Sequence, residues 1–163
     1  MKQLYIIRHA KSSWKDFSLD DFDRPLNKRG ENNAPFMGKI LKEQKILPDI
    51  IISSPALRAK TTALSIAKCI DYEANISFDK NIYEASYTTI ESKLKTIDKK
   101  NNIVFLFGHN PGLNMFAYEY IGLYQNIPTC GIVKIEFDCN SWENISPSNA
   151  KLIFFDYPKK QRD

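Results

Sequence analysis

The chain has 163 residues, a formal net charge of +4 and 43% hydrophobic residues, a composition typical of a soluble globular protein. This length predicts a single domain over residues 1–163, and the modest charge is compatible with an anionic substrate but gives no reason to expect nucleic-acid binding. No apolar run approaches the ~20 residues of a membrane-spanning helix and the first residues show no signal-peptide pattern, so we expect a cytoplasmic protein that does not bind membranes.

The first predicted element is a strand at residues 4–7, an apolar run that leads directly into Arg8 and His9. A helix should follow, because apolar residues then recur at helical spacing up to Leu41. Pro35 conflicts with the interior of that helix and is tolerated only if the helix begins shortly before it.

A second buried strand is predicted at residues 50–52, followed by the segment SPALRAKTT at residues 54–62. In this segment Ser54 is expected to cap a helix and Pro55 to occupy its first position. Arg58 then projects from the first turn, close to the end of the strand.

The middle of the chain continues the alternation of strands and helices. The short segment NIYEAS, residues 81–86, is predicted to place Glu84 at a strand end, and a helix follows it. A third buried strand at residues 103–107 leads into GHNPG, which places His109 at the start of a further helix.

The carboxyl-terminal part has a different pattern. Apolar and polar residues alternate from Val133 to Asp138, which predicts a half-exposed strand, and AKLIFFDY at residues 150–157 predicts a partner for it. The predicted fold class is therefore α/β, a three-layer α/β/α arrangement with a mostly parallel central sheet, helices on both faces and a carboxyl-terminal edge strand pair.

Ligands of open α/β sheets bind beyond the carboxyl ends of the strands, and four functional groups are predicted there: Arg8, His9, Arg58 and His109. Any one of them alone is more readily explained as a hydrogen-bonded structural group. The coincidence of four, which includes both histidines of the chain, favours a site. Two guanidinium groups, two imidazoles and helix amino termini suit a phosphoryl group.

Other chemistries lack their motifs. The chain has no P-loop and no HExxH or comparable cluster of metal ligands, so we expect neither metal nor cofactor. Its cysteines (Cys69, Cys130 and Cys139) are odd in number and lack C-x-x-C spacing, which favours small core or surface residues over a disulfide framework.

Four motifs together resemble the histidine phosphatase superfamily, also called phosphoglycerate mutase-like: RHA at residues 8–10, SPALRAKTT, GHNPG and DFDRPLNKRG at residues 21–30. The last of these is similar to the small SixA-type phosphohistidine phosphatases. The resemblance runs from the first strand to the helix after His109. One departure is Ala10, where glycine is common in the family, and alanine predicts an ordinary backbone conformation at this turn.

The resemblance implies roles for the predicted site residues. His9 matches the nucleophile that accepts the phosphoryl group, while Arg8 and Arg58 would neutralise the phosphoryl oxygens. His109 matches a second histidine that binds the same oxygens, with a buried structural histidine as the alternative. Thr62 is expected to support the helix rather than to touch the substrate.

Three further residues are candidates with open alternatives. Larger relatives place a general acid at the position of Glu84, but a solvated surface carboxylate is an equal reading. Lys11 and Arg24 lie in loops near the same edge and are candidates for substrate binding. Arg24 could instead anchor its own loop to Asp21 or Asp23.

The connection between Glu84 and Ile103 is short and holds one helix, whereas larger relatives have a lid there. An open pocket suits a phosphorylated protein side chain, and the resemblance implies histidine-phosphotransfer domains as partners. We therefore predict a metal-independent phosphatase of protein phosphohistidine. The alternatives are a phosphatase of a small phosphate ester, such as a sugar or metabolite, and a non-catalytic phosphoprotein-binding module. The oligomeric state is left open.

Overall fold

The computed structural model describes residues 1–162 and contains one six-stranded sheet. The strands are β1 (Lys2–Arg8), β2 (Ile50–Ser53), β3 (Ser77–Phe78), β4 (Ile103–Gly108), β5 (Ile132–Phe137) and β6 (Ala150–Asp156). The helices are α1 (Lys28–Glu43), α2 (Leu57–Cys69), α3 (Tyr87–Lys95), α4 (Gly112–Ile121) and α5 (Pro158–Arg162). Within residues 1–162, no helix is both long and apolar enough to cross a membrane.

The strand order is β3-β2-β4-β1-β5-β6. Strands β1 to β4 are mutually parallel, whereas β5 runs antiparallel to β1, and β6 runs antiparallel to β5 and forms the edge of the sheet. The mostly parallel sheet and the carboxyl-terminal edge pair are both confirmed.

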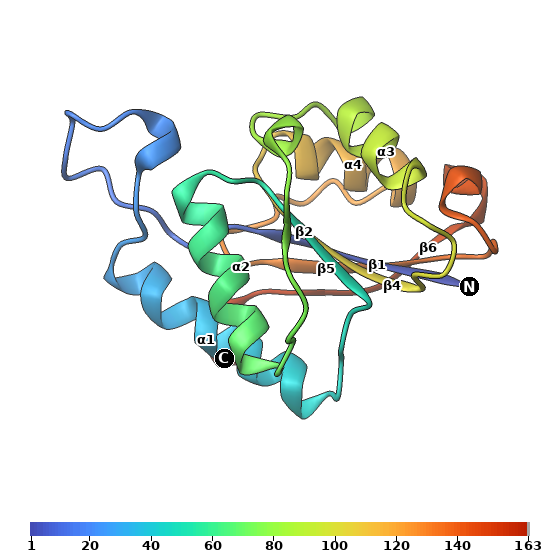
Figure 1. Cartoon of the computed structure of the whole chain (residues 1–163), viewed down its shortest axis with the longest axis horizontal. Coiled ribbons are helices and arrows are strands. Elements are labelled where there is room, and N and C mark those ends of the chain that lie inside the picture. The colour runs from blue at the N-terminus through green and yellow to red at the C-terminus, as the bar shows by residue number, and fades with distance from the viewer. Residues whose placement is uncertain (163) are drawn as a thin grey trace.

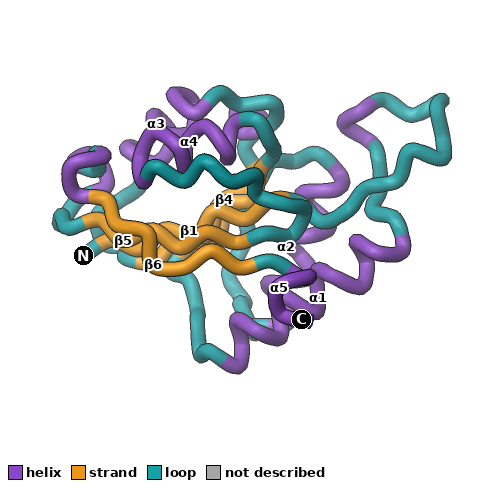
Figure 2. Tube along the Cα trace, turned by 180° about the vertical axis from the view of Figure 1, so that it is seen from behind, coloured by secondary structure: helices purple, strands orange, loops and turns teal. Residues whose placement is uncertain are grey.

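Helices cover both faces of the sheet (Figures 1 and 2). Along β1, Leu4 and Ile6 pack into the core beneath α3 and α4, while Tyr5 and Ile7 pack into the core against α1 and α2. Because successive side chains of a strand point to opposite faces, an apolar run without alternation supplies both cores at once. The three-layer prediction is confirmed.

The expectation for Pro35 was wrong, because α1 begins seven residues earlier, at Lys28. The side chain of Asn27 caps this start by accepting a hydrogen bond from the Gly30 amide at 2.9 Å. Pro35 lies on the exposed face of the helix. Water can therefore take the place of the amide that proline lacks, so the helix continues through it.

Two local predictions also need correction. Helix α2 begins at Leu57 with Ala56 at its cap position and without a side-chain cap, so Ser54 and Pro55 precede the helix. The segment NIYEAS is not a strand: it contains the end of a 3-10 helix, Lys80–Ile82, and a turn, and the strand of this region is β3. Residue Glu84 in that turn has a φ of 56°, which is incompatible with a strand.

Candidate active site

The two histidines meet because β1 and β4 are adjacent parallel strands. Arg8 pairs with Gly108 in the sheet, and the His9 amide donates to the Gly108 carbonyl oxygen at 3.2 Å. Each strand is therefore followed at the same level by a histidine, and the ring centroids of His9 and His109 lie 5.2 Å apart. This spacing allows both rings to contact one phosphoryl group.

A cavity of about 150 Å³ lies at this edge of the sheet. It brings together six of the seven predicted site residues and four that sequence reasoning did not place there. The lining residues are Arg8, His9, Lys11, Ser12, Trp14, Arg24, Arg58, His109, Asn110 and Thr129. Four of them carry a lysine or arginine side chain that is cationic at neutral pH, so the cavity favours an anion: Arg8, Lys11, Arg24 and Arg58.

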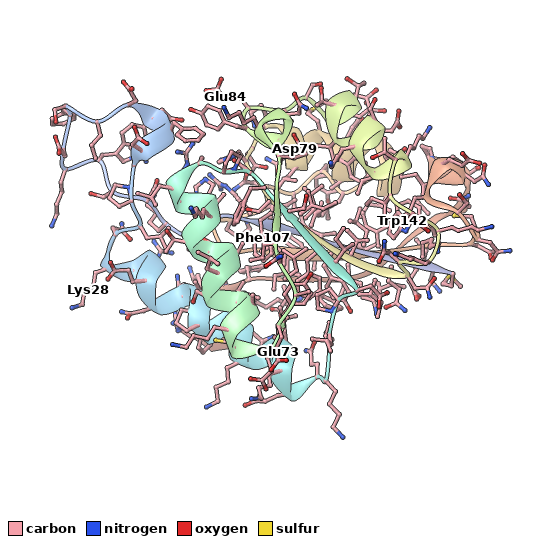
Figure 3. All side chains as sticks on the ribbon, viewed as in Figure 1. Lys28, Glu73, Asp79, Glu84, Phe107 and Trp142 are labelled. Carbon is pink, nitrogen blue, oxygen red and sulfur yellow. The ribbon has the colours of Figure 1, made fainter. Side chains whose placement is uncertain are left out.

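Glu84 is the predicted site residue that lies outside this cavity. Its side chain is exposed, and Figure 3 shows it at the surface, away from the sheet. The preceding residue faces the site instead: the Tyr83 ring lies 5.5 Å from the His109 ring, and its hydroxyl donates to Asp21 at 2.6 Å. The carboxylate near the site is that of Asp21, which forms ion pairs with Arg24 and Arg58.

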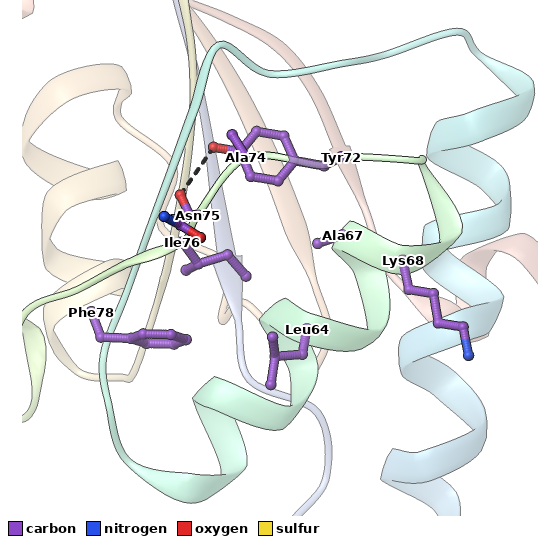
Figure 4. A pocket seen from close by; sticks show the side chains of 8 residues that line it. All are labelled: Leu64, Ala67, Lys68, Tyr72, Ala74, Asn75, Ile76 and Phe78. Carbon is purple, nitrogen blue, oxygen red and sulfur yellow. Dashed lines mark hydrogen bonds between the residues drawn. The ribbon is translucent and has the colours of Figure 1, made fainter.

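A larger groove of about 560 Å³ lies between α2 and the segment that leads to β3 (Figure 4). It holds none of the predicted site residues, and Lys68 is its one charged lining residue. This groove therefore lacks the groups that phosphoryl chemistry needs.

His9 is held as a neutral base. Its Nδ1 lies 2.7 Å from the Ala10 carbonyl oxygen. A carbonyl can only accept, so Nδ1 carries the proton and Nε2 keeps its lone pair. Burial is the main cause that lowers the pKa of His9 to about 4. The hydrogen bond to Ala10 acts to raise this pKa, whereas the positive charges of Arg58 and Arg8 act to lower it. At neutral pH the ring is therefore uncharged, with the Nε2 lone pair available.

Ser54 contacts the ring of His109. Ser54 Oγ accepts from the Ala56 amide at 3.2 Å and lies 2.8 Å from His109 Nε2. The hydroxyl can donate to Nε2 or accept from it, and where it donates the ring proton lies on Nδ1. Burial, followed by the charges of His9 and Arg58, lowers the pKa of His109 to about 3, so this ring is also neutral.

Two residues that line the cavity each have a buried nitrogen without a hydrogen-bond partner. Among the side chains of residues 1–162, His109 Nδ1 and Arg8 Nε are the buried polar atoms that lack a hydrogen bond. An unsatisfied buried polar atom is costly, and both of these belong to residues that line one cavity. Arg8 Nε is a donor, and His109 Nδ1 is a donor in the tautomer in which Ser54 donates to Nε2.

Asp21 orients both arginines that enter the site from outside β1. Its side chain accepts from Arg58 Nη2 at 2.9 Å and from Arg24 Nη1 at 3.0 Å, and its backbone carbonyl accepts from Arg58 Nη1 at 2.6 Å. Partial burial acts to raise the pKa of Asp21, but the hydrogen bonds from Tyr83, Arg58 and Arg24 hold it well below its ordinary value. Arg24 thus anchors its own loop and also lines the cavity.

Thr62 fixes the turn that carries His9. Its buried hydroxyl accepts from the Ala10 amide at 2.9 Å and donates to the Arg58 carbonyl at 2.7 Å, joining the end of β1 to α2. Ala10 is absent from the residues with positive φ, which confirms its ordinary backbone conformation. Gly30 packs on the same loop so closely that a Cβ would lie 2.1 Å from the Lys11 carbonyl oxygen, which explains the glycine of the RPL segment.

Replacing Thr62 with valine is expected to lower the free energy of unfolding by about 1–3 kcal/mol, because the buried Ala10 amide loses its acceptor while the volume is kept. Urea denaturation measures this. Thr61→Val is the matched control: that hydroxyl only donates to the Leu57 carbonyl within α2, and we expect a change within about 0.5 kcal/mol. Equal effects of the two substitutions would show that the Thr62 bridge carries no stability.

Known proteins are similar to this chain in sequence and in fold. The family model of the histidine phosphatase superfamily, branch 1, matches residues 4–116. An uncharacterized chloroplastic protein of Arabidopsis thaliana is 35% identical over 153 residues, which cover 87% of this chain and 69% of that protein.

Two solved structures are similar over nearly the whole chain. A SixA protein from Agrobacterium tumefaciens, assigned as a phosphohistidine phosphatase, has a TM-score of 0.84 at 26% identity and covers 96% of this chain and 98% of its own. The protein histidine phosphatase SixA complexed with tungstate has the same TM-score of 0.84 at 20% identity, covering 98% of this chain and 99% of its own. The chain belongs to branch 1 of the histidine phosphatase superfamily, and its fold is that of the small SixA-type phosphatases.

Proposed function

We propose that this chain is a metal-independent phosphatase that removes phosphate from phosphohistidine on a protein, with His9 as the transient phosphoryl acceptor. The observation that carries the proposal is the neutral imidazole of His9, whose Nδ1 binds the Ala10 carbonyl so that Nε2 keeps its lone pair, in a cavity also lined by Arg8, Arg58 and His109. Positive charge and hydrogen-bond donors around such an acceptor stabilise the charge on a transferring phosphoryl group.

In the proposed reaction His9 Nε2 attacks phosphorus, and the bond between phosphorus and the substrate nitrogen breaks with its electrons remaining on that nitrogen. His109 Nδ1 and Arg8 Nε donate to phosphoryl oxygens, and the guanidinium of Arg58 adds positive charge. Water then attacks the phosphorus of phospho-His9. This second step releases inorganic phosphate and returns the neutral ring.

The cavity also bears on the leaving group. Among the described residues that line it there is no carboxylate. An alkoxide leaving from an ester is strongly basic and requires a proton donor at the breaking bond, whereas the second ring nitrogen of phosphohistidine has a pKa of ~6.5, takes its proton from water near neutral pH and lets the ring leave as neutral imidazole. The lining therefore favours a phosphohistidine substrate over an ester.

The size of the cavity favours a protein as the substrate. At about 150 Å³ it is smaller than the ~300–1,000 Å³ of ordinary small-molecule sites, so it encloses little more than the phosphoryl group. The rest of the substrate must lie outside it. The similarity to the SixA protein from Agrobacterium tumefaciens supports the same choice.

The test compares kcat/KM for a histidine-phosphotransfer domain phosphorylated on histidine with kcat/KM for p-nitrophenyl phosphate, both in EDTA. We expect the phosphoprotein to be preferred by at least about 100-fold, because binding energy from the rest of the substrate is available only there. A preference for the ester would instead make the chain a small-ester phosphatase. Saturable binding of the phosphoprotein without phosphate release would make it a binding module.

A further inference from the structure

The segment between β1 and α1 forms a closed loop beside the cavity, here called the Trp14 loop and defined as residues 11–26. Its two ends pair with each other: the Ser13 amide donates to the Pro25 carbonyl at 2.8 Å, and Ser12 and Leu26 form an antiparallel bridge. Figures 1 and 2 both show this part of the chain projecting from the body of the molecule. The loop therefore projects from the body of the protein and is closed at its base by backbone pairing.

The apex of the Trp14 loop is ordered by its own hydrogen bonds. The Asp16 carboxylate accepts from the Ser18 amide at 3.0 Å, and the Leu19 amide donates to the Asp16 carbonyl at 3.4 Å. This is an Asx turn, in which Phe17 occupies the tip. Because the turn fixes the backbone without using the Phe17 side chain, the ring is presented outward at a small entropic cost to any later contact.

Three large apolar side chains of the Trp14 loop are exposed together. Phe17 is 91% exposed, Trp14 63% and Leu19 38%. Single exposed apolar residues are ordinary, but three within six positions of one ordered projection mark an interaction surface. Lys15 and Asp16 lie between Trp14 and Phe17, and Asp20 follows Leu19, so the segment from Trp14 to Asp20 has a net charge of −1 (one lysine, two aspartates), which favours a protein partner over an anionic membrane.

Trp14 belongs both to this exposed surface and to the lining of the cavity. Its ring is covered by the Arg24 guanidinium, 3.2 Å from the ring centroid, and both residues line the cavity. The remaining surface of the indole is exposed. Trp14 thus connects the cavity, which it lines, to the loop segment that carries the exposed Phe17 and Leu19.

We propose that the Trp14 loop is the docking surface for the phosphohistidine-bearing protein, with Phe17 as the aromatic anchor that contacts the surface around the phosphorylated histidine. This inference rests on the proposed function and adds a specificity determinant that does not contact the phosphoryl group. Aromatic anchors at the centre of an interface typically account for a large share of its binding energy.

The experiment measures kcat/KM of the wild type and of Phe17→Ser on two substrates that contain the same scissile bond. One is a histidine-phosphotransfer domain phosphorylated on histidine, and the other is free phosphohistidine. For the domain we expect a loss of about tenfold or more, and for the free amino acid a change within about twofold. Leu47→Ser is the matched control, because Leu47 is 53% exposed and precedes the amino end of β2, whereas the cavity lies at the carboxyl ends of the parallel strands.

Each outcome decides between the alternatives. A loss confined to the phosphorylated domain in Phe17→Ser, with Leu47→Ser equal to wild type, supports docking on the Trp14 loop. Equal activity of Phe17→Ser and wild type on the domain overturns the docking surface and leaves the proposed function intact. A similar loss on both substrates also overturns it, since the loop would then act on the cavity itself. A wild type inactive on the domain but active on p-nitrophenyl phosphate overturns both proposals.

Discussion

Replacing His9 with glutamine is expected to lower kcat/KM by about 10⁴-fold or more on any phosphorylated substrate, because the variant has no nitrogen lone pair to attack phosphorus. Glutamine keeps a planar polar side chain of similar size, so the loss would report chemistry rather than packing. The measurement is phosphate release in EDTA, together with capture of labelled enzyme after a rapid quench in base, in which phosphohistidine survives.

His109→Gln separates the two imidazole roles. This variant keeps His9 and loses the second imidazole that lines the cavity, so we expect a smaller loss of about 10²-fold, with the labelled intermediate still formed. Labelling of His9→Gln at the wild-type level would show that another residue accepts the phosphoryl group. Equal losses in both variants, with labelling in neither, would show that the two rings cannot be assigned separate roles.

The principal candidate residues could be predicted because their placement depends only on which strand each one follows. Arg8, His9, Arg58 and His109 follow three apolar runs, and parallel strands bring their carboxyl ends to one edge whatever the strand order. The short separation of His9 and His109 needed the structure, since it depends on β1 and β4 being neighbours although about a hundred residues separate them in the chain.

Residues that act through other residues escaped prediction. The Tyr83 hydroxyl donates to Asp21 at 2.6 Å although 62 residues separate them in the chain. The hydrophobic periodicity of the sequence does not predict such a contact. Ser54 was expected to cap α2, because serine followed by proline is a common start of a helix. Its hydroxyl does bind a backbone amide, but it does so before the helix begins and also contacts His109. The sequence pattern predicted that Ser54 binds a backbone amide, but its contact with His109 depends on the tertiary structure.

The error at NIYEAS has a related cause. Short segments with one β-branched and one aromatic residue fit a strand and a turn equally well, and here the 3-10 turn is favoured because Asp79 accepts from the Asn81 amide at 2.9 Å. Glu84 consequently occupies a left-handed position at the surface. Its role as general acid stays a prediction, and phosphohistidine as substrate makes that role less necessary.

The second large effect is expected in the pH dependence of stability. Folding lowers the pKa of His9 to about 4 and that of His109 to about 3, in both cases chiefly through burial, from an ordinary value of 6.5. Between these values the unfolded chain binds protons that the native chain does not, so acid favours unfolding. The free energy of unfolding should therefore fall by about 3–4 kcal/mol from pH 7 to pH 5, and this contribution is fully present only above pH ~6.5.

Urea denaturation at several pH values tests this, and the composition of the chain makes the readout specific. His9 and His109 are its two histidines, and carboxylates begin to titrate only below this window, so the slope between pH 7 and pH 5 reports the site alone. The double variant His9→Gln, His109→Gln should unfold with nearly constant free energy over the same range. A wild type as flat as the double variant would mean that both rings are solvated in the native state, and the neutral nucleophile would then lose its physical basis.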